Sequence, residues 1–147
     1  MKKIIFFLIS ALIGIELFAG IVIAPTIFFP QKYGLNISLT LFESGLLMTR
    51  IFVILGYILF PIALIGLFYA LVQKNKILLA VMFIIASLVS LFVFYFTPFI
   101  LESQALGELA TQNKQFAQMH TYSQWCLKAI IFFQFIGLIL LAQGPRK

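Results

Sequence analysis

Four long apolar runs, at residues 4–29, 45–72, 77–101 and 121–142, constrain the fold of this chain more than any other feature. A helix needs about 20 apolar residues to cross roughly 30 Å of hydrocarbon. Because no water reaches the backbone inside a bilayer, runs of this length should be helical. The sequence therefore predicts an all-α, integral membrane four-helix bundle that forms a single domain over residues 1–147.

The composition agrees with a membrane protein and argues against a nucleic-acid-binding one. Hydrophobic residues make up 63% of the chain and charged residues 10%, whereas a soluble domain has about 25% charged residues. The net charge is +6, but the basic residues form no stripe interleaved with exposed aromatic residues, which nucleic-acid binding requires. We expect the lipid bilayer as a partner and no nucleic acid.

The placement of Lys and Arg predicts the orientation, because short, positively charged loops resist translocation. One side of a four-span bundle carries Lys2, Lys3, Lys74, Lys76, Arg146 and Lys147, and the other side carries Lys32 and Lys114. We therefore predict that the N-terminus and the C-terminus are both cytoplasmic and that the protein lies in a bacterial cytoplasmic (inner) membrane.

The two longer connections also carry helical patterns. In residues 30–44, Leu35, Leu39 and Phe42 are spaced by four and three, which predicts a short helix in the membrane interface. Residues 102–120 show helical spacing as well, so the fourth span should begin before residue 121 as an amphipathic extension. Pro61 lies in the middle of the second span and should kink it.

Three charged side chains fall within the predicted spans, where each is costly without a partner. Glu16 lies about 18 Å from the cytoplasmic end of the first span, and Lys128 about 12 Å from the outer end of the fourth. The two depths allow an ion pair. Alternatively, Glu16 belongs to a transport or proton path, or is a neutral carboxyl group. Arg50 lies close enough to the outer end of the second span for its side chain to reach the headgroups.

The fourth span has one polar side. At 100° per residue, this side holds His120, Ser123, Gln124, Lys128 and Gln134. We expect it to face the bundle or a wet cavity, either as hydrogen bonds between helices or as a substrate path. On the same projection Ile130 lies on another side and should face lipid.

Metal binding is a minor alternative. Met48, Met119 and His120 lie near the outer surface and would suit Cu(I), but Met119 and His120 point to different sides of one helix. We expect no metal and no cofactor. No nucleophile adjoins a histidine and no glycine-rich phosphate loop occurs, so we do not expect an enzyme.

Two stretches resemble a known family. The first is Gly20-Ile21-Val22-Ile23-Ala24-Pro25-Thr26-Ile27-Phe28 followed by Gly45 to Phe52, and the second is Met119-His120-Thr121-Tyr122-Ser123. Both are similar to the small membrane proteins grouped as transmembrane protein 205-like, of the DUF4149 type. The resemblance implies a four-helix membrane protein of poorly defined role, with a vertebrate relative linked to drug resistance. It singles out Pro25 and His120.

Our leading hypothesis is a non-enzymatic membrane protein for small-solute or cation handling, or for resistance, acting through Glu16, Arg50, His120 and Lys128 together with Ser123 and Gln124. The alternative is an accessory or structural subunit of a larger membrane complex, or a homo-oligomer, that packs through its Phe-rich surfaces.

Overall fold

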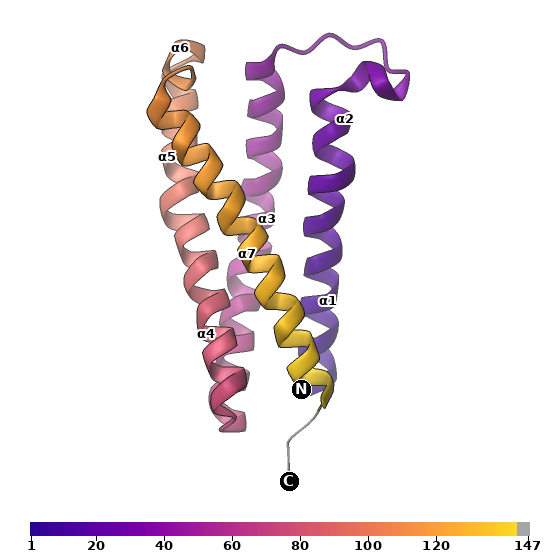
Figure 1. Ribbon diagram of the computed structural model, residues 1–147, viewed down its shortest axis with the longest axis vertical. Helices are drawn as coiled ribbons and strands as arrows, with labels where there is room; N and C mark the ends of the chain where they lie inside the picture. Colours follow the sequence, from indigo (N-terminus) through magenta and orange to yellow (C-terminus); the bar gives the residue numbers. More distant parts are fainter. Residues whose placement is uncertain (144–147) are drawn as a thin grey trace.

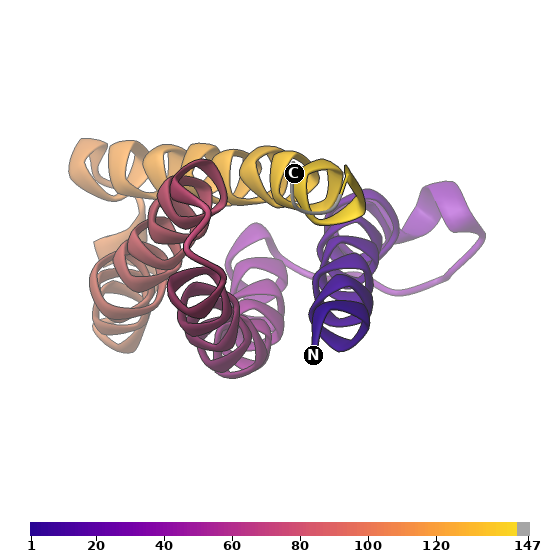
Figure 2. The ribbon, with the colours of Figure 1, turned by 90° about the horizontal axis from the view of Figure 1, so that it is seen from below.

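The computed structural model describes residues 1–143 and shows a bundle of long helices (Figure 1). The first span is formed by α1 (Lys2–Phe18), the π-helical segment η1 (Ala19–Ile23) and α2 (Ala24–Phe28). The second is α3 (Leu41–Gln73), and the third is α4 (Lys76–Leu91), the π-helical segment η3 (Phe92–Phe96) and α5 (Thr97–Ala105). The fourth is α7 (Lys114–Gln143). Helix α1 packs against α3, α3 against α4, α4 against α7 and α7 against α1, so the spans form a closed ring (Figure 2).

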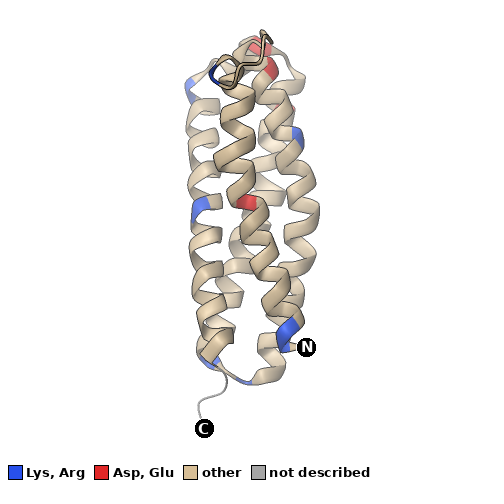
Figure 3. Ribbon diagram, turned by 90° about the vertical axis from the view of Figure 1, so that its right-hand side faces the viewer, with Lys and Arg blue, Asp and Glu red and all other residues tan. Residues whose placement is uncertain are grey.

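The prediction of four membrane-spanning helices is confirmed. Four helical stretches, Lys2–Phe28, Leu41–Gln73, Lys76–Ala105 and Lys114–Gln143, are long and apolar enough to cross a bilayer. Most charged residues gather at the two ends of the bundle, and its long middle part is mostly uncharged (Figure 3). The direction in which the bundle crosses the membrane stays a prediction.

The two ends of the bundle differ in structure. We call the end with Lys2, the short α3–α4 turn and Gln143 the terminal end, and the end with residues 29–40 and α6 (Glu108–Thr111) the loop end (Figure 1). The α3–α4 turn is short because Asn75 caps α4 at once, its side chain accepting hydrogen bonds from the backbone N–H groups of Ile77 and Leu78. Spans two and three are therefore adjacent and antiparallel.

The main core lies towards the terminal end. Leu59 of α3, Met82 and Val89 of α4, and Ile130 and Leu141 of α7 are almost fully buried there. Helix α7 crosses the bundle diagonally, from α5 and α6 at the loop end to α1 at the terminal end (Figures 1 and 2). The four spans are therefore closely packed towards the terminal end and diverge towards the loop end.

The expectation that Ile130 faces lipid is wrong. Its side chain has no exposed surface, because α7 meets the core through a stripe that contains Cys126, Ile130, Gln134 and Gly137. The lipid-facing surface of α7 instead carries large apolar side chains such as Trp125 and Phe132, which are 64% and 61% exposed. In a bilayer both the core and the outer surface are apolar, so hydrophobicity does not separate them.

The short interfacial helix predicted around Leu35 and Leu39 is also wrong. A short 3-10 helix, η2 (Pro30–Tyr33), ends at Gly34, whose φ of 73° belongs to the left-handed region. The chain then has no helix until Thr40. There the Thr40 side chain and Glu43 form a capping box, which starts α3 at Leu41 and places Phe42 in its first turn.

Two further predictions concern the ends and the course of the spans. Helix α7 begins at Lys114, so the prediction that the fourth span starts before residue 121 is confirmed. Pro61 lies inside α3, which continues as one helix to Gln73, and the predicted kink stays a prediction. The irregular turns occur elsewhere, in η1 and η3, and each is closely followed by a proline, Pro25 or Pro98.

Candidate functional site

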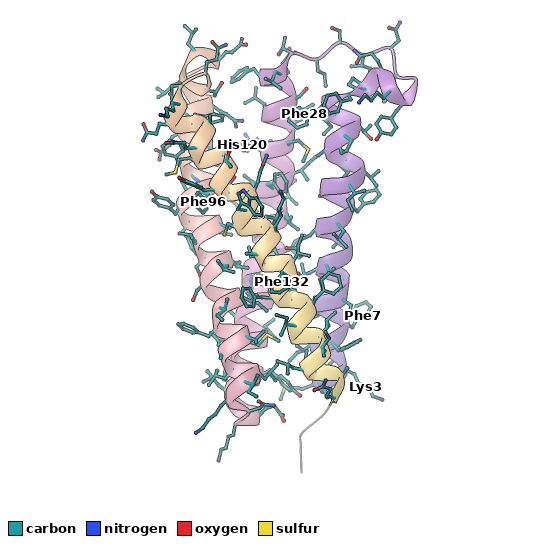
Figure 4. The ribbon with its side chains drawn as sticks, in the orientation of Figure 1. Lys3, Phe7, Phe28, Phe96, His120 and Phe132 are labelled. Carbon is teal, nitrogen blue, oxygen red and sulfur yellow. The ribbon has the colours of Figure 1, made fainter. Side chains whose placement is uncertain are left out.

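A cavity of about 700 Å³ lies between the spans in the loop-end half of the molecule. Its size is typical of sites for drug-sized ligands. Apolar side chains from every span contribute to its wall, including Ile21, Phe28, Phe52, Phe92 and Phe116. Figure 4 labels Phe28 on α2 and His120 on α7, two residues that line it. The cavity exists because α7 leans away from the first span here.

Glu16 is the acidic residue buried in the wall of this cavity. It is 1% exposed, and neither of its carboxylate oxygens has a hydrogen-bond partner within the described residues. The side-chain amide of Gln134 lies beside it, but the Oε1 atom of Gln134 is itself unpaired. A buried carboxylate without a partner is costly. The site therefore has an unused capacity to bind a hydrogen-bond donor or a cation.

Lys128 lines the same cavity as Glu16. The ion pair that the depths of the two residues allow is not formed. The Lys128 ammonium lies 4.6 Å from the centre of the Trp125 ring, and Trp125 is not part of the cavity wall. A cation over an aromatic ring is stabilised by the ring quadrupole. Within residues 1–143, Glu16 is thus left without a basic partner.

The polar side of α7 faces the cavity. His120, Ser123 and Gln124 line it along with Lys128. The Nε2 atoms of His120 and Gln124 are 3.0 Å apart, so the glutamine is positioned by the imidazole one turn before it. The hydroxyl of Ser123 donates to the carbonyl of His120 at 2.7 Å. The His120 ring stacks on Phe116 with an interplanar angle of 4°. These contacts stay within α7, so they leave polar groups available to a ligand.

Two polar residues of the opposite wall were missed by sequence reasoning. Gln104 of α5 is 8% exposed, and its side-chain amide donates to the Thr49 hydroxyl of α3 at 3.0 Å. Both residues line the cavity. The only signal in the sequence for this part of the wall was Gln104, a glutamine just after the apolar run 77–101. Arg50, which was a candidate, is exposed and lies outside the cavity wall.

The π-helical segments align the residues that line the cavity. On the first span these residues include Glu16, Gly20, Ala24 and Phe28, each four positions after the last. In a regular α-helix such four-residue steps drift by about 40° each, at 100° per residue. The wider turns of η1 offset part of this drift. Segment η1 therefore keeps Glu16 and the residues of α2 on one side of the span.

Segment η3 has the same effect on the third span. Phe92 and Thr97 line the cavity five positions apart, which is the π-helical spacing. The Thr97 hydroxyl donates to the Phe92 carbonyl at 2.8 Å. Thr26, beside Pro25, likewise donates to the Val22 carbonyl at 2.7 Å. Hydroxyl groups beside a proline satisfy carbonyls in irregular turns of membrane helices, so both segments are stable features of the wall.

The residues considered for metal binding do not come together as a set. Met48 and His120 line the cavity and Met119 does not. Within residues 1–143, no three His, Cys, Asp or Glu side chains are close enough to hold a metal ion. The cavity instead offers the buried carboxyl group of Glu16, the exposed carboxyl group of Glu108, Lys128, several neutral polar groups and a largely apolar wall.

Comparison with known proteins identifies the family. No curated protein and no solved structure matches the chain closely enough to count as a relative. A family described as a domain of unknown function, DUF4149, matches residues 7–108. The match includes the Gly20–Phe28 and Gly45–Phe52 stretches that suggested this family, and it ends before Met119–Ser123. Because residues 7–108 make up more than half of the chain, this protein belongs to the DUF4149 family.

Proposed function

We propose that this protein is a non-enzymatic membrane protein that binds a small organic cation in its cavity, as part of solute handling or resistance. The observation that carries the proposal is Glu16, a buried carboxylate without a partner in the wall of a cavity of about 700 Å³. A carboxylate in this setting is stabilised by a bound cation far more than an exposed one would be.

The rest of the wall fits an organic cation better than a metal ion. Hard metal ions need several oxygen ligands, whereas Glu16 is accompanied mainly by aromatic and aliphatic side chains such as Phe52 and Phe92. Aromatic faces attract organic cations such as quaternary ammonium groups. His120 and Gln124 add neutral hydrogen-bonding groups on α7. The ligand should therefore combine one positive charge with apolar surface.

The alternative role, as an accessory subunit, draws on exposed aromatic residues such as Phe132 and Phe94. A bilayer requires an apolar outer surface in any case. These residues therefore do not favour a subunit over a lone protein, whereas the cavity supports a ligand-binding role.

Binding of tetraphenylphosphonium to the purified protein in a neutral detergent tests the proposal. Saturable binding is expected for the wild type and is expected to weaken by about tenfold or more in Glu16→Gln, which corresponds to about 1.4 kcal/mol. Glu102→Gln is the matched control, because Glu102 is exposed and lies outside the cavity wall. Equal binding by the two variants would refute the role of Glu16, as would the absence of binding to folded wild type.

A folding control belongs to the same experiment. Glu16→Gln keeps the size of the side chain and replaces a buried carboxyl group without a partner by a neutral amide, so this variant should still fold. Its thermal unfolding, followed by circular dichroism, separates lost binding from lost structure.

A further inference from the structure

The cavity has an opening on one side, between the first span and α7. Helix α2 packs against α3, where the Ser44 hydroxyl donates to the Ile27 carbonyl at 3.3 Å. Within residues 1–143, α2 has no packed interface with α7. Residues of both helices nevertheless line the cavity, Phe28 on one side and Phe116 on the other. The cavity is therefore unsealed between the first span and the loop-end half of α7, where Figures 1 and 2 show the two elements diverging.

The part of this opening beside Leu17 and Ile21 lies within the apolar first span. The residues on its two sides belong to the stretches Lys2–Phe28 and Lys114–Gln143, each able to span a bilayer. Leu17 and Ile21 line the cavity and are also 37% and 65% exposed, so their side chains reach from the cavity to the outer surface of the bundle. The opening therefore faces hydrocarbon rather than water on the side of the first span.

The two sides of the opening differ in polarity. The first span presents Leu17 and Ile21, whereas α7 presents Gln124 and Lys128, which are exposed and line the cavity as well. A molecule in this opening would meet apolar surface on one side, polar groups on the other and the Glu16 carboxylate inside. This arrangement of polar and apolar surfaces suits an amphiphile with a charged head and an apolar tail.

We infer that the cation bound at Glu16 is the head of a single-chain amphiphile that reaches the cavity from the bilayer, between the first span and α7. This inference rests on the proposed function and adds the class and the route of the ligand. The head lies beside Glu16, and the tail lies in the opening against Leu17 and Ile21. The polar side chains Gln124 and Lys128 lie on the opposite side of the opening.

Photo-crosslinking tests the route. The probe is an alkyltrimethylammonium with a diazirine at the end of its tail, added to the full-length protein in lipid nanodiscs, and the crosslinked residues are identified by mass spectrometry. We expect crosslinks around Leu17 and Ile21. Access from water through the loop end would place them instead around Leu41, Thr111 and Gln112, which line the cavity at that end, and this result would overturn the lateral route.

Repeating the labelling with Glu16→Gln and Glu102→Gln separates this inference from the proposed function. Crosslinks at Leu17 and Ile21 that fall about tenfold in Glu16→Gln alone support both. Crosslinks at the loop end that fall in the same way leave the proposed function standing and overturn the lateral route. Crosslinks that are equal in both variants, at either place, show only lipid contact and contradict both proposals.

Discussion

At the residue scale, Glu16 shows how far depth along a helix predicts a site. Counting residues from the ends of the spans placed Glu16 and Lys128 at one level, and both line the same cavity. The count could not show that the Lys128 ammonium lies on the Trp125 ring. Rotamers depend on neighbouring side chains in three dimensions, and no spacing rule along one helix contains that information.

Because Lys128 shares the cavity with Glu16, it opposes a cationic ligand. Replacing it by glutamine should strengthen the binding of tetraphenylphosphonium by about 1 kcal/mol, or several-fold in Kd. Binding titrations of Lys128→Gln measure the change, and Lys114→Gln is the control because Lys114 is exposed and outside the cavity wall. Weaker binding in Lys128→Gln would show that the lysine supports the ligand and would contradict this account.

Ile130 is a residue whose environment could not be predicted from the sequence. It is fully buried, while Phe132 two positions later is 61% exposed. Ile130→Ala should therefore lower the free energy of unfolding by about 2 kcal/mol or more through the cavity it leaves. Phe132→Ala, although it removes a larger side chain, should have a much smaller effect. Unfolding in mixed micelles measures both values, and a larger loss for Phe132→Ala would contradict the orientation of α7.

At the element scale, the number of spans followed from the sequence, but their irregular turns did not. Apolar length predicts a helix because the bilayer leaves the backbone no other partner. It does not predict η1 and η3, where the backbone departs from regular α-helix over five residues each. Pro25 and Pro98 were the available signals, whereas Pro61 drew the prediction of a kink.

The contact between α4 and α7 depends on a glycine. A Cβ atom on Gly137 would lie 3.0 Å from the Met82 side chain and 3.7 Å from that of Ile85. Small residues allow membrane helices to approach closely in this way. Gly14 has no such neighbour, since nothing lies within 4 Å of the corresponding position.

Gly137→Leu should therefore force α7 away from α4 and lower the stability of the protein, by about 1 to 3 kcal/mol if the core relaxes around it. Gly14→Leu should be tolerated, because the new side chain would project into lipid. Thermal unfolding of the two variants in the same detergent gives the comparison. Equal loss of stability would argue against the close approach of α4 and α7.

At the scale of the whole molecule, the closed ring of spans could be predicted only in part. The short turn at Asn75 makes spans two and three neighbours. The tilt of α7 depends on side-chain packing at both of its ends, and hydropathy contains no information on it. The cavity follows from that tilt. The polar side of α7 indicated that this helix faces the bundle or a wet cavity, but neither the volume of the cavity nor its side opening could be derived from the sequence.

The orientation predicted from Lys and Arg can be measured with single cysteines. In a Cys126→Ala background, Gln115→Cys near the start of α7 should react with a membrane-impermeant maleimide on intact cells. Gln73→Cys at the α3–α4 turn should react only after the cells are permeabilised, because the terminal end is predicted to be cytoplasmic. Both positions are exposed. The reverse pattern of labelling would show that the bundle crosses the membrane in the opposite direction.

The central claim is that Glu16 is an unpaired carboxyl group within reach of a ligand in the cavity. Its reaction with dicyclohexylcarbodiimide, a lipid-soluble reagent for carboxyl groups, tests this most directly. Mass spectrometry of protein in nanodiscs should find the adduct on Glu16, and added tetraphenylphosphonium should slow its formation without slowing modification of Glu102. An adduct on Glu16 that forms equally fast with and without the cation would contradict the account.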